Sequence, residues 1–209
     1  MGDTENTPRA LGSMAVNDLL EALASKTPAP GGGAAAGVAG ATACGLASMV
    51  INYSLGKKRF AEHEAALTEH GAFFERARGL LMQLADEDAA AFPALQAAQK
   101  LPDDDPGKAR AVTMATDAAI GAPRATLAAA ADVLRRLERL PAITNRHLAS
   151  DLAIAALLAE TAAASAAWNV RVNLGLLNDE QAWAIEAETT TLVREAGERR
   201  RAVELACVA

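Results

Sequence analysis

The segment Asp86-Glu87-Asp88 carries the residues best suited to chemistry, because it lies inside a long stretch of helical composition. On a helical wheel, Asp88 shares one stripe with apolar residues, namely Ala77, Leu81, Leu84, Phe92 and Leu95. Burial raises the pKa of such a carboxyl group, which favours general acid–base catalysis near neutral pH. The alternative is a structural hydrogen-bond partner, since a buried carboxylate needs one. Asp86 lies about 160° away on the wheel and is either a second catalytic carboxylate or a solvated surface charge.

The histidines give no metal-binding pattern. His63, His70 and His147 are the three in the chain, and none has a glutamate three residues before it, as a di-iron bundle requires. His63-Glu64 is followed by Leu67, where a zinc-binding HExxH motif needs histidine. Neither a serine nor a cysteine triad is supported. We therefore expect a site without a metal and without a tightly bound cofactor.

A second polar line runs along the alanine-rich stretch 148–177. Asp151, Ser165, Asn169 and Asn173 share one face of the expected helix, and Ser150 is placed to cap its N-terminus. These side chains either bind a ligand or form a polar seam between helices. Arg171 points elsewhere on the wheel and is either a ligand contact or half of a surface salt bridge.

Three consecutive glycines, Gly31, Gly32 and Gly33, precede an alanine-rich helix expected over 34–55. A glycine turn that opens a helix presents unpaired N–H groups, which suit an anion or a carbonyl-rich ring. Within the helix, small residues recur on one stripe at Gly33, Gly37, Gly40, Cys44 and Ser48. That stripe is equally expected of a tight helix–helix seam. The cations Lys57, Lys58 and Arg59 follow directly.

The composition predicts an all-α fold. Hydrophobic residues make up 51% of the 209, yet aromatics only 3%, so alanine and leucine dominate. Helical spacing and breakers give helices over 14–25, 34–55, 60–100, 108–140, 148–177 and 178–206, with Pro93 and Pro123 expected to kink or restart two of them. We expect an antiparallel bundle of five to six helices forming one domain over 14–209, after a disordered tail over 1–13.

Charge and targeting patterns limit the partners. The net charge of −6 argues against nucleic acid. The segment 34–51 lacks charge, but alanine and glycine gain little from lipid, so we expect a core helix and no membrane partner. No signal-like N-terminus is present, which favours a cytoplasmic protein. Two specialised helix faces exceed the need of one thin bundle, which predicts a homodimer.

Several stretches together resemble the cyclodeaminase/cyclohydrolase family of folate enzymes. They lie in the family's order and are PAPGGGAAA at 28–36, ASMV at 47–50, LGKKRF at 55–60, DEDAAAF at 86–92, KLP at 100–102, SD at 150–151 and NVRVNL at 169–174. Where the family has Gly-Asn-x-Asn shortly before Ser-Asp, this chain has Thr144-Asn145-Arg146-His147. The resemblance implies a helical dimer that binds a tetrahydrofolate without a metal.

The resemblance implies a methenyltetrahydrofolate cyclohydrolase, which opens 5,10-methenyltetrahydrofolate to 10-formyltetrahydrofolate. Asp88, with Asp86, would supply acid–base catalysis. Lys57, Lys58 and Arg171 would meet the glutamate carboxylates. Asp151, or the asparagines Asn169 and Asn173, would contact the donors and acceptors of the pterin. Two alternatives are open: a formimidoyltetrahydrofolate cyclodeaminase that releases ammonia, and a non-catalytic folate-binding dimer. The absence of a fused formiminotransferase domain favours the cyclohydrolase, and the altered 144–147 segment favours the non-catalytic reading.

Overall fold

The computed structural model describes residues 10–209, and every regular element in that range is helical. The elements are η1 (Leu11–Ser13), α1 (Val16–Ala24), α2 (Gly32–Asn52), η2 (Lys58–His63), α3 (Glu64–Gln99), α4 (Lys108–Leu137), η3 (Arg146–Leu148), α5 (Ala149–Asn173), η4 (Leu174–Leu176) and α6 (Asp179–Val208). The all-α prediction is confirmed.

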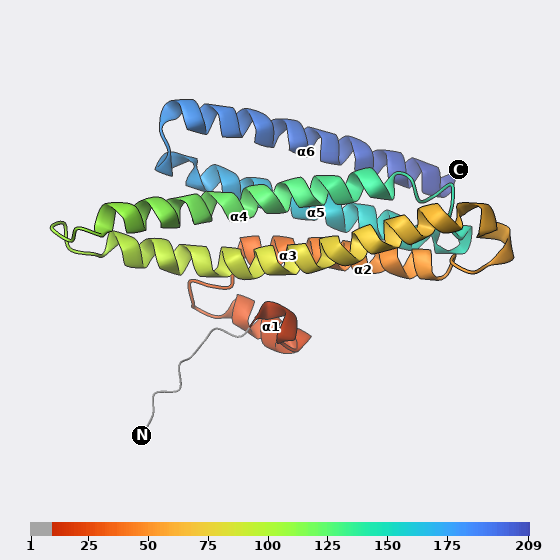
Figure 1. Ribbon diagram of the computed structural model, residues 1–209, viewed down its shortest axis with the longest axis horizontal. Helices are drawn as coiled ribbons and strands as arrows, with labels where there is room; N and C mark the ends of the chain where they lie inside the picture. Colours follow the sequence, from red (N-terminus) through yellow and green to blue (C-terminus); the bar gives the residue numbers. More distant parts are fainter. Residues whose placement is uncertain (1–9) are drawn as a thin grey trace, which may run out of the picture.

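Helices α2, α3, α4 and α5 form an up-and-down bundle in which each helix packs against the next and α5 closes the ring on α2 (Figure 1). The connections between them are short, which forces antiparallel neighbours. Helix α6 lies outside this ring and covers α4 and α5. Because α2 and α5 are antiparallel, the first turn of α2 lies beside the last turns of α5.

The core is built from alanines because α2 approaches its neighbours very closely. A Cβ on Gly37 would lie 2.6 Å from the Leu81 carbonyl oxygen, and one on Gly40 would lie 3.1 Å from Leu81 Cδ1 and 3.3 Å from Ala162 Cβ. The small stripe is therefore a helix–helix seam along these two positions. Of the most apolar window of α2, 61% is buried inside the bundle, which explains its lack of charge.

Four local expectations have definite outcomes. Helices α3 and α4 do not restart at Pro93 or Pro123, both of which lie inside them. Ser150 is not a cap, because α5 begins one residue earlier and takes Leu148 as its N-cap. Phe92 is 49% exposed, so it does not belong to the buried stripe of Asp88, whereas Leu95 on the same stripe is buried. Asn178 does cap α6, accepting a hydrogen bond from the Gln181 N–H at 2.9 Å.

The segment before α2 lies beside the bundle (Figure 1). Leu11 in η1 is buried against Ala34 and Ala85, so the packed chain includes part of the expected tail. The remainder of that tail, residues 1–9, lies outside the described residues. Helix α1 has no fully buried residue and leaves Val16 and Leu20 exposed.

Candidate active site

The first turn of α2 presents open backbone donors. Gly31 is the N-cap and has no side chain to cap the helix. The first hydrogen bond inside the helix runs from the Ala35 N–H to the Gly31 carbonyl at 3.0 Å. The N–H groups of the three residues between them have no acceptor within the helix. One of these three, the Ala34 N–H, donates to the carboxylate of Asp88 on α3.

Gly33 leaves the space that the Asp88 carboxylate occupies. A Cβ on Gly33 would lie under 3.0 Å from Asp88 Cγ and from both of its carboxyl oxygens. The backbone of α2 can thus carry the Asp88 side chain on its surface only while residue 33 is glycine. The position sits at the N-terminal end of the small stripe, so the same glycine spacing that packs α2 against α3 also seats the carboxylate.

Asp88 is half-buried, and its burial raises the pKa of the carboxyl group above 3.8, while the Ala34 hydrogen bond partly opposes that rise. The positive end of the α2 dipole also favours the ionised form. Within residues 10–209, Asp88 forms no ion pair with lysine, arginine or histidine. An unpaired, partly desolvated carboxylate is suited to a cationic ligand and to proton transfer.

Asn169 of α5 faces the same turn. Both terminal atoms of its side chain would lie 3.9 Å from a Cβ on Gly32. Its Nδ2 donates to the Ser165 carbonyl at 3.0 Å, which leaves Oδ1 as an acceptor. Asn173 behaves differently, because its Nδ2 donates to the Ala119 carbonyl at 2.8 Å and to the Asn169 carbonyl at 3.0 Å. Asn173 therefore joins α5 to α4, as the polar-seam alternative expects.

Asp86 points away from Asp88, as the helical wheel predicts. Its Oδ1 accepts a hydrogen bond from the Leu11 N–H at 2.7 Å. Asp86 is half-buried rather than freely solvated, and it attaches the N-terminal segment to α3. The structure thus places only one of the two aspartates at the turn of α2.

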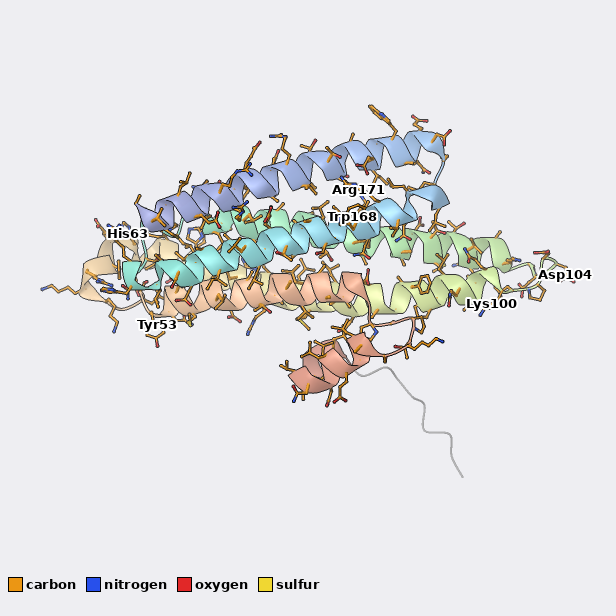
Figure 2. All side chains as sticks on the ribbon, turned by 180° about the vertical axis from the view of Figure 1, so that it is seen from behind. Tyr53, His63, Lys100, Asp104, Trp168 and Arg171 are labelled. Carbon is orange, nitrogen blue, oxygen red and sulfur yellow. The ribbon has the colours of Figure 1, made fainter. Side chains whose placement is uncertain are left out.

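Lys57, Lys58 and Asp151 lie at one end of the bundle, about the length of α2 away from Asp88. Helix α2 has 21 residues, so its two ends are about 30 Å apart at about 1.5 Å per residue. Figure 2 shows Tyr53 near one end of the bundle, Trp168 near its middle, and Lys100 and Asp104 at the other end. Within one chain these three residues cannot share a small ligand with Asp88.

The altered segment before α5 is tied to that same far end. The Asn145 N–H donates to Ser54 Oγ at 3.0 Å, and the Arg59 guanidinium donates to Asn145 Oδ1. Asn145 Oδ1 also accepts from the His147 N–H at 3.2 Å. Asn145 therefore orders the connection between α4 and α5 and holds the basic run near it.

Arg171 is engaged on α6. Its Nε donates to Glu186 Oε1 at 3.0 Å and to Oε2 at 3.2 Å, and its guanidinium lies 5.9 Å from the Trp168 ring centroid (Figure 2). Within the chain, Arg171 therefore forms a salt bridge with Glu186, which is one of the two roles expected from the sequence.

Two features of the site escape sequence reasoning. The Ala34 N–H carries no side-chain signal, and the contact between Gly33 and Asp88 joins residues far apart in sequence. The three glycines indicate a helix N-terminus with unpaired N–H groups, but they do not indicate that Asp88 lies against it. Across residues 10–209, no group of three or more His, Cys, Asp or Glu is arranged to hold a metal ion.

Comparisons with known proteins show what this chain is similar to. A family model described as formiminotransferase-cyclodeaminase matches residues 15–190. The chain is 34% identical over 192 residues to a methenyltetrahydrofolate cyclohydrolase of Methylorubrum extorquens, which covers 89% of this chain and 92% of that protein. It is 32% identical over 179 residues to a formimidoyltransferase-cyclodeaminase of Sus scrofa, covering 83% of this chain and 33% of that protein. The crystal structure of a formiminotetrahydrofolate cyclodeaminase from Thermotoga maritima matches with a TM-score of 0.85 at 27% identity, covering 94% of this chain and 97% of that one.

Proposed function

We propose that this chain, which belongs to the formiminotransferase-cyclodeaminase family, is a methenyltetrahydrofolate cyclohydrolase. It is a folate cyclohydrolase or cyclodeaminase by its relatives, and the similarity to the Methylorubrum extorquens enzyme over 92% of that protein favours the former. The observation that carries the proposal is the unpaired Asp88 carboxylate seated on Gly33. A localisation in the cytoplasm stays a prediction.

The substrate of this reaction is already an electrophilic cation, so the protein need not activate it with a metal. Water attacks the methenyl carbon, and the Asp88 carboxylate takes one of its protons. The bond from that carbon to N5 then breaks, N5 gains a proton from the Asp88 carboxylic acid, and the carbon remains on N10 as a formyl group. The hydroxyl proton of the adduct leaves to solvent, which balances the reaction. General acid–base catalysis of this kind is worth about 10²–10⁴-fold.

The α2 turn supports both the acid and the substrate. The Ala34 N–H fixes the carboxylate, whose negative charge complements the methenyl cation in a partly desolvated position. The remaining N–H groups at Gly32 and Gly33 are directed to carbonyl or carboxylate oxygens of the folate. Asn169 Oδ1 is placed to accept from a pterin donor. Arg171 and Asn173 are not proposed as ligands, because Arg171 pairs with Glu186 and the Asn173 amide donates to the Ala119 carbonyl.

We further propose that the active enzyme is a homodimer in which each site combines opposite ends of two chains. Asp151 and Asn169 lie on α5 about five full turns apart, so both side chains point to the same flank of that helix. A two-fold axis across this face would bring Lys57, Lys58 and Asp151 of a second copy to the Asp88 turn. The lysines would then meet the glutamate carboxylates of the folate.

An exposed apolar stripe supports this pairing. Ile154, Leu157, Trp168 and Val172 are each 42–73% exposed and lie along one side of α5. Of the most apolar window in the stretch 146–176, only 33% is buried within the chain. Large apolar side chains aligned in this way mark an interaction surface.

Complementation tests the shared site. Asp88→Asn should inactivate one half of each site, and Lys57→Gln with Lys58→Gln should weaken the other at low substrate. Mixed and re-equilibrated, the two variants should regain up to about a quarter of wild-type activity, because half of the dimers are mixed and each mixed dimer holds one intact site. Activity of the mixture equal to the average of the separate variants would show that each site lies within one chain.

The reaction itself is tested by loss of absorbance of the methenyl chromophore. Wild-type protein should accelerate that loss, and Asp88→Asn should remove most of the acceleration. The alternative, a formimidoyltetrahydrofolate cyclodeaminase, is favoured by the likeness to the Thermotoga maritima protein. Ammonia release from formimidoyltetrahydrofolate, without hydrolysis of the methenyl compound, would replace the cyclohydrolase by this alternative.

A further inference from the structure

A cavity of about 500 Å³ lies between the first turns of α3 and the end of α4. It is lined by three arginines and two carboxylates, namely Arg135, Arg136, Arg139, Glu69 and Asp132, together with His70 and Phe73. The distance along α3 from this cavity to Asp88 is about 25 Å at the rise of an α-helix. It is therefore separate from the Asp88 turn of the same chain, and its size falls in the range of small-molecule sites.

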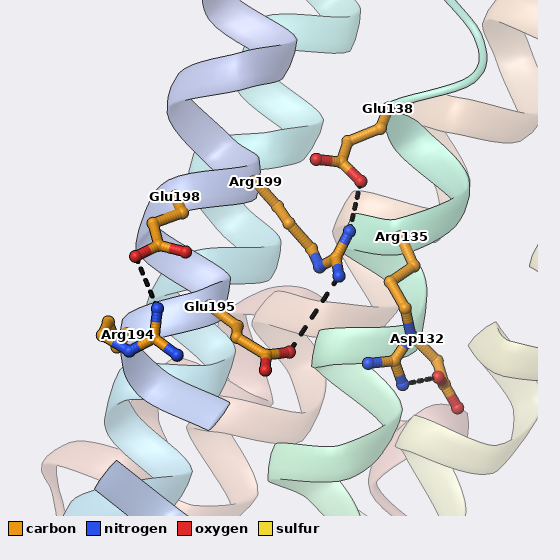
Figure 3. Close-up of polar contacts among 7 residues, drawn as sticks. All are labelled: Asp132, Arg135, Glu138, Arg194, Glu195, Glu198 and Arg199. Carbon is orange, nitrogen blue, oxygen red and sulfur yellow. Dashed lines mark hydrogen bonds and ion pairs between the residues drawn. The ribbon is translucent and has the colours of Figure 1, made fainter. Parts of the chain in front are cut away.

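The positive charge of the cavity exceeds its negative charge by one. Arg136 pairs with Glu69 at 2.8 Å and lies 5.0 Å from the Phe73 ring centroid, and Arg135 pairs with Asp132. Figure 3 shows the Arg135–Asp132 pair on the flank of α4 away from α6. Arg139 has no ion pair within residues 10–209, although its charge reaches Glu69 and His70.

Besides the excess positive charge, the buried side chain of His70 indicates that the cavity binds a ligand. Its side chain lines the cavity yet the residue is only 6% exposed, and its Nδ1 is buried with no partner among the described residues. Burial first, and Arg136 second, lower the pKa of the imidazole, which favours its neutral form. A buried polar atom without a partner is costly, which a ligand group in the cavity can relieve.

We propose that this cavity binds a small molecule with two or more closely spaced carboxylate or phosphate groups. Guanidinium groups recognise such anions with paired, charge-assisted hydrogen bonds. Arg139 supplies the uncompensated charge, Arg135 and Arg136 contribute donors from the same side of the cavity, and His70 contacts the ligand from α3. The group bound here lies about 25 Å along α3 from Asp88 of the same chain and does not contact that carboxylate.

Calorimetric titration with pyrophosphate, and separately with a γ-linked triglutamate, tests the site and distinguishes a phosphorylated ligand from a glutamate chain. At least one should bind wild-type protein with one molecule per chain. Arg139→Gln should weaken that binding by about tenfold or more. Arg110→Gln is the matched control, since Arg110 is an exposed arginine on α4 at the opposite end of that helix, and it should bind as wild type does.

Histidine resonances locate the bound anion, because the chain has only three histidines. On titration the ring nitrogens of His70 should shift in a long-range ¹H–¹⁵N spectrum, while those of His63 and His147 should stay in place. Asp88→Asn should bind the anion as wild type does. The proposal is overturned if neither anion binds at millimolar concentration, if Arg110→Gln weakens binding as much as Arg139→Gln, or if His70 does not respond.

Discussion

Replacing Gly33 with alanine tests the link between the packing of α2 and the chemistry at Asp88. The new Cβ would lie under 3.0 Å from three atoms of the Asp88 carboxyl group, whereas ordinary contacts are 3.4–4 Å. The carboxylate must therefore leave its rotamer and move by about 1 Å or more. That movement breaks its hydrogen bond to the Ala34 N–H.

The expected costs separate catalysis from folding. Losing the Ala34 hydrogen bond to a charged group costs about 1.5–3 kcal/mol. Alanine in place of glycine within the helix returns about 0.5–1 kcal/mol. The net destabilisation is therefore about 0.5–2.5 kcal/mol, small beside the 5–15 kcal/mol (roughly) of a whole domain. Loss of the positioned base should instead lower kcat/KM by about 10²–10⁴-fold.

The assay is methenyl absorbance for kcat/KM, with chemical denaturation for stability. Two other glycines serve as controls. A Cβ on Gly32 would meet Asn169 at an ordinary 3.9 Å, and one on the exposed Gly79 of α3 would meet nothing within 4 Å. Gly32→Ala should retain most activity, and Gly79→Ala should retain all of it while gaining about 0.5–1 kcal/mol of stability.

A double substitution identifies the clashing group. In an Asp88→Ala background the carboxylate is gone, so adding Gly33→Ala should stabilise the protein by about 0.5–1 kcal/mol. The reasoning is refuted if Gly33→Ala keeps wild-type kcat/KM. It is equally refuted if the alanine destabilises the Asp88→Ala background as much as it destabilises wild type.

Three further outcomes are expected. Asp88→Asn should remove most turnover. Its free energy of unfolding relative to wild type should also rise as the pH increases from 3.8, because burial raises the pKa of Asp88 in the folded state and ionisation therefore favours the unfolded chain. Parallel curves of unfolding free energy against pH for the two proteins would contradict this. Asp86→Asn should keep turnover near wild type, since an amide oxygen still accepts from the Leu11 N–H; a loss as large as that of Asp88→Asn would make Asp86 the catalytic group. Replacing Lys57 and Lys58 with glutamine should raise KM for polyglutamylated folate more than it lowers kcat, and the reverse pattern would remove their binding role.

The helices could be predicted because each carries its own local signals. Apolar spacing and the alanine-rich composition place α2 to α6 within a few residues of their observed ends, and Asn178 is a cap by its type and position. The errors lie where tertiary contacts override a local rule. Pro93 and Pro123 are tolerated because their helices are long and are held by packing on both sides of the proline.

The candidate site could be predicted only in part. Asp88 and the glycine run are recognisable by residue type and by the wheel, which also separates Asp86 correctly. Contacts between distant residues could not be read in this way. Nothing local to Asn173 or Arg171 indicates that Ala119 and Glu186 occupy their donors. A polar residue on an apolar helix face is compatible with a ligand contact or an interhelical bond, and only the neighbouring helix decides.

If Asp88, Lys57 and Asp151 form one site, as proposed, their separation within the chain bears on how the protein assembles. In an up-and-down bundle, the end of α2 and the start of α5 meet at one end, while the start of α2 and the end of α5 meet at the other. Residues with one function at the two ends of α2, about 30 Å apart, cannot converge within one rigid bundle. Convergence requires a second copy turned end for end. The same arrangement would bury the exposed stripe of α5, which has no other cover within residues 10–209. Pairing and catalysis would then depend on the same face, so a substitution that weakens the dimer, such as Trp168→Glu, should also reduce folate turnover.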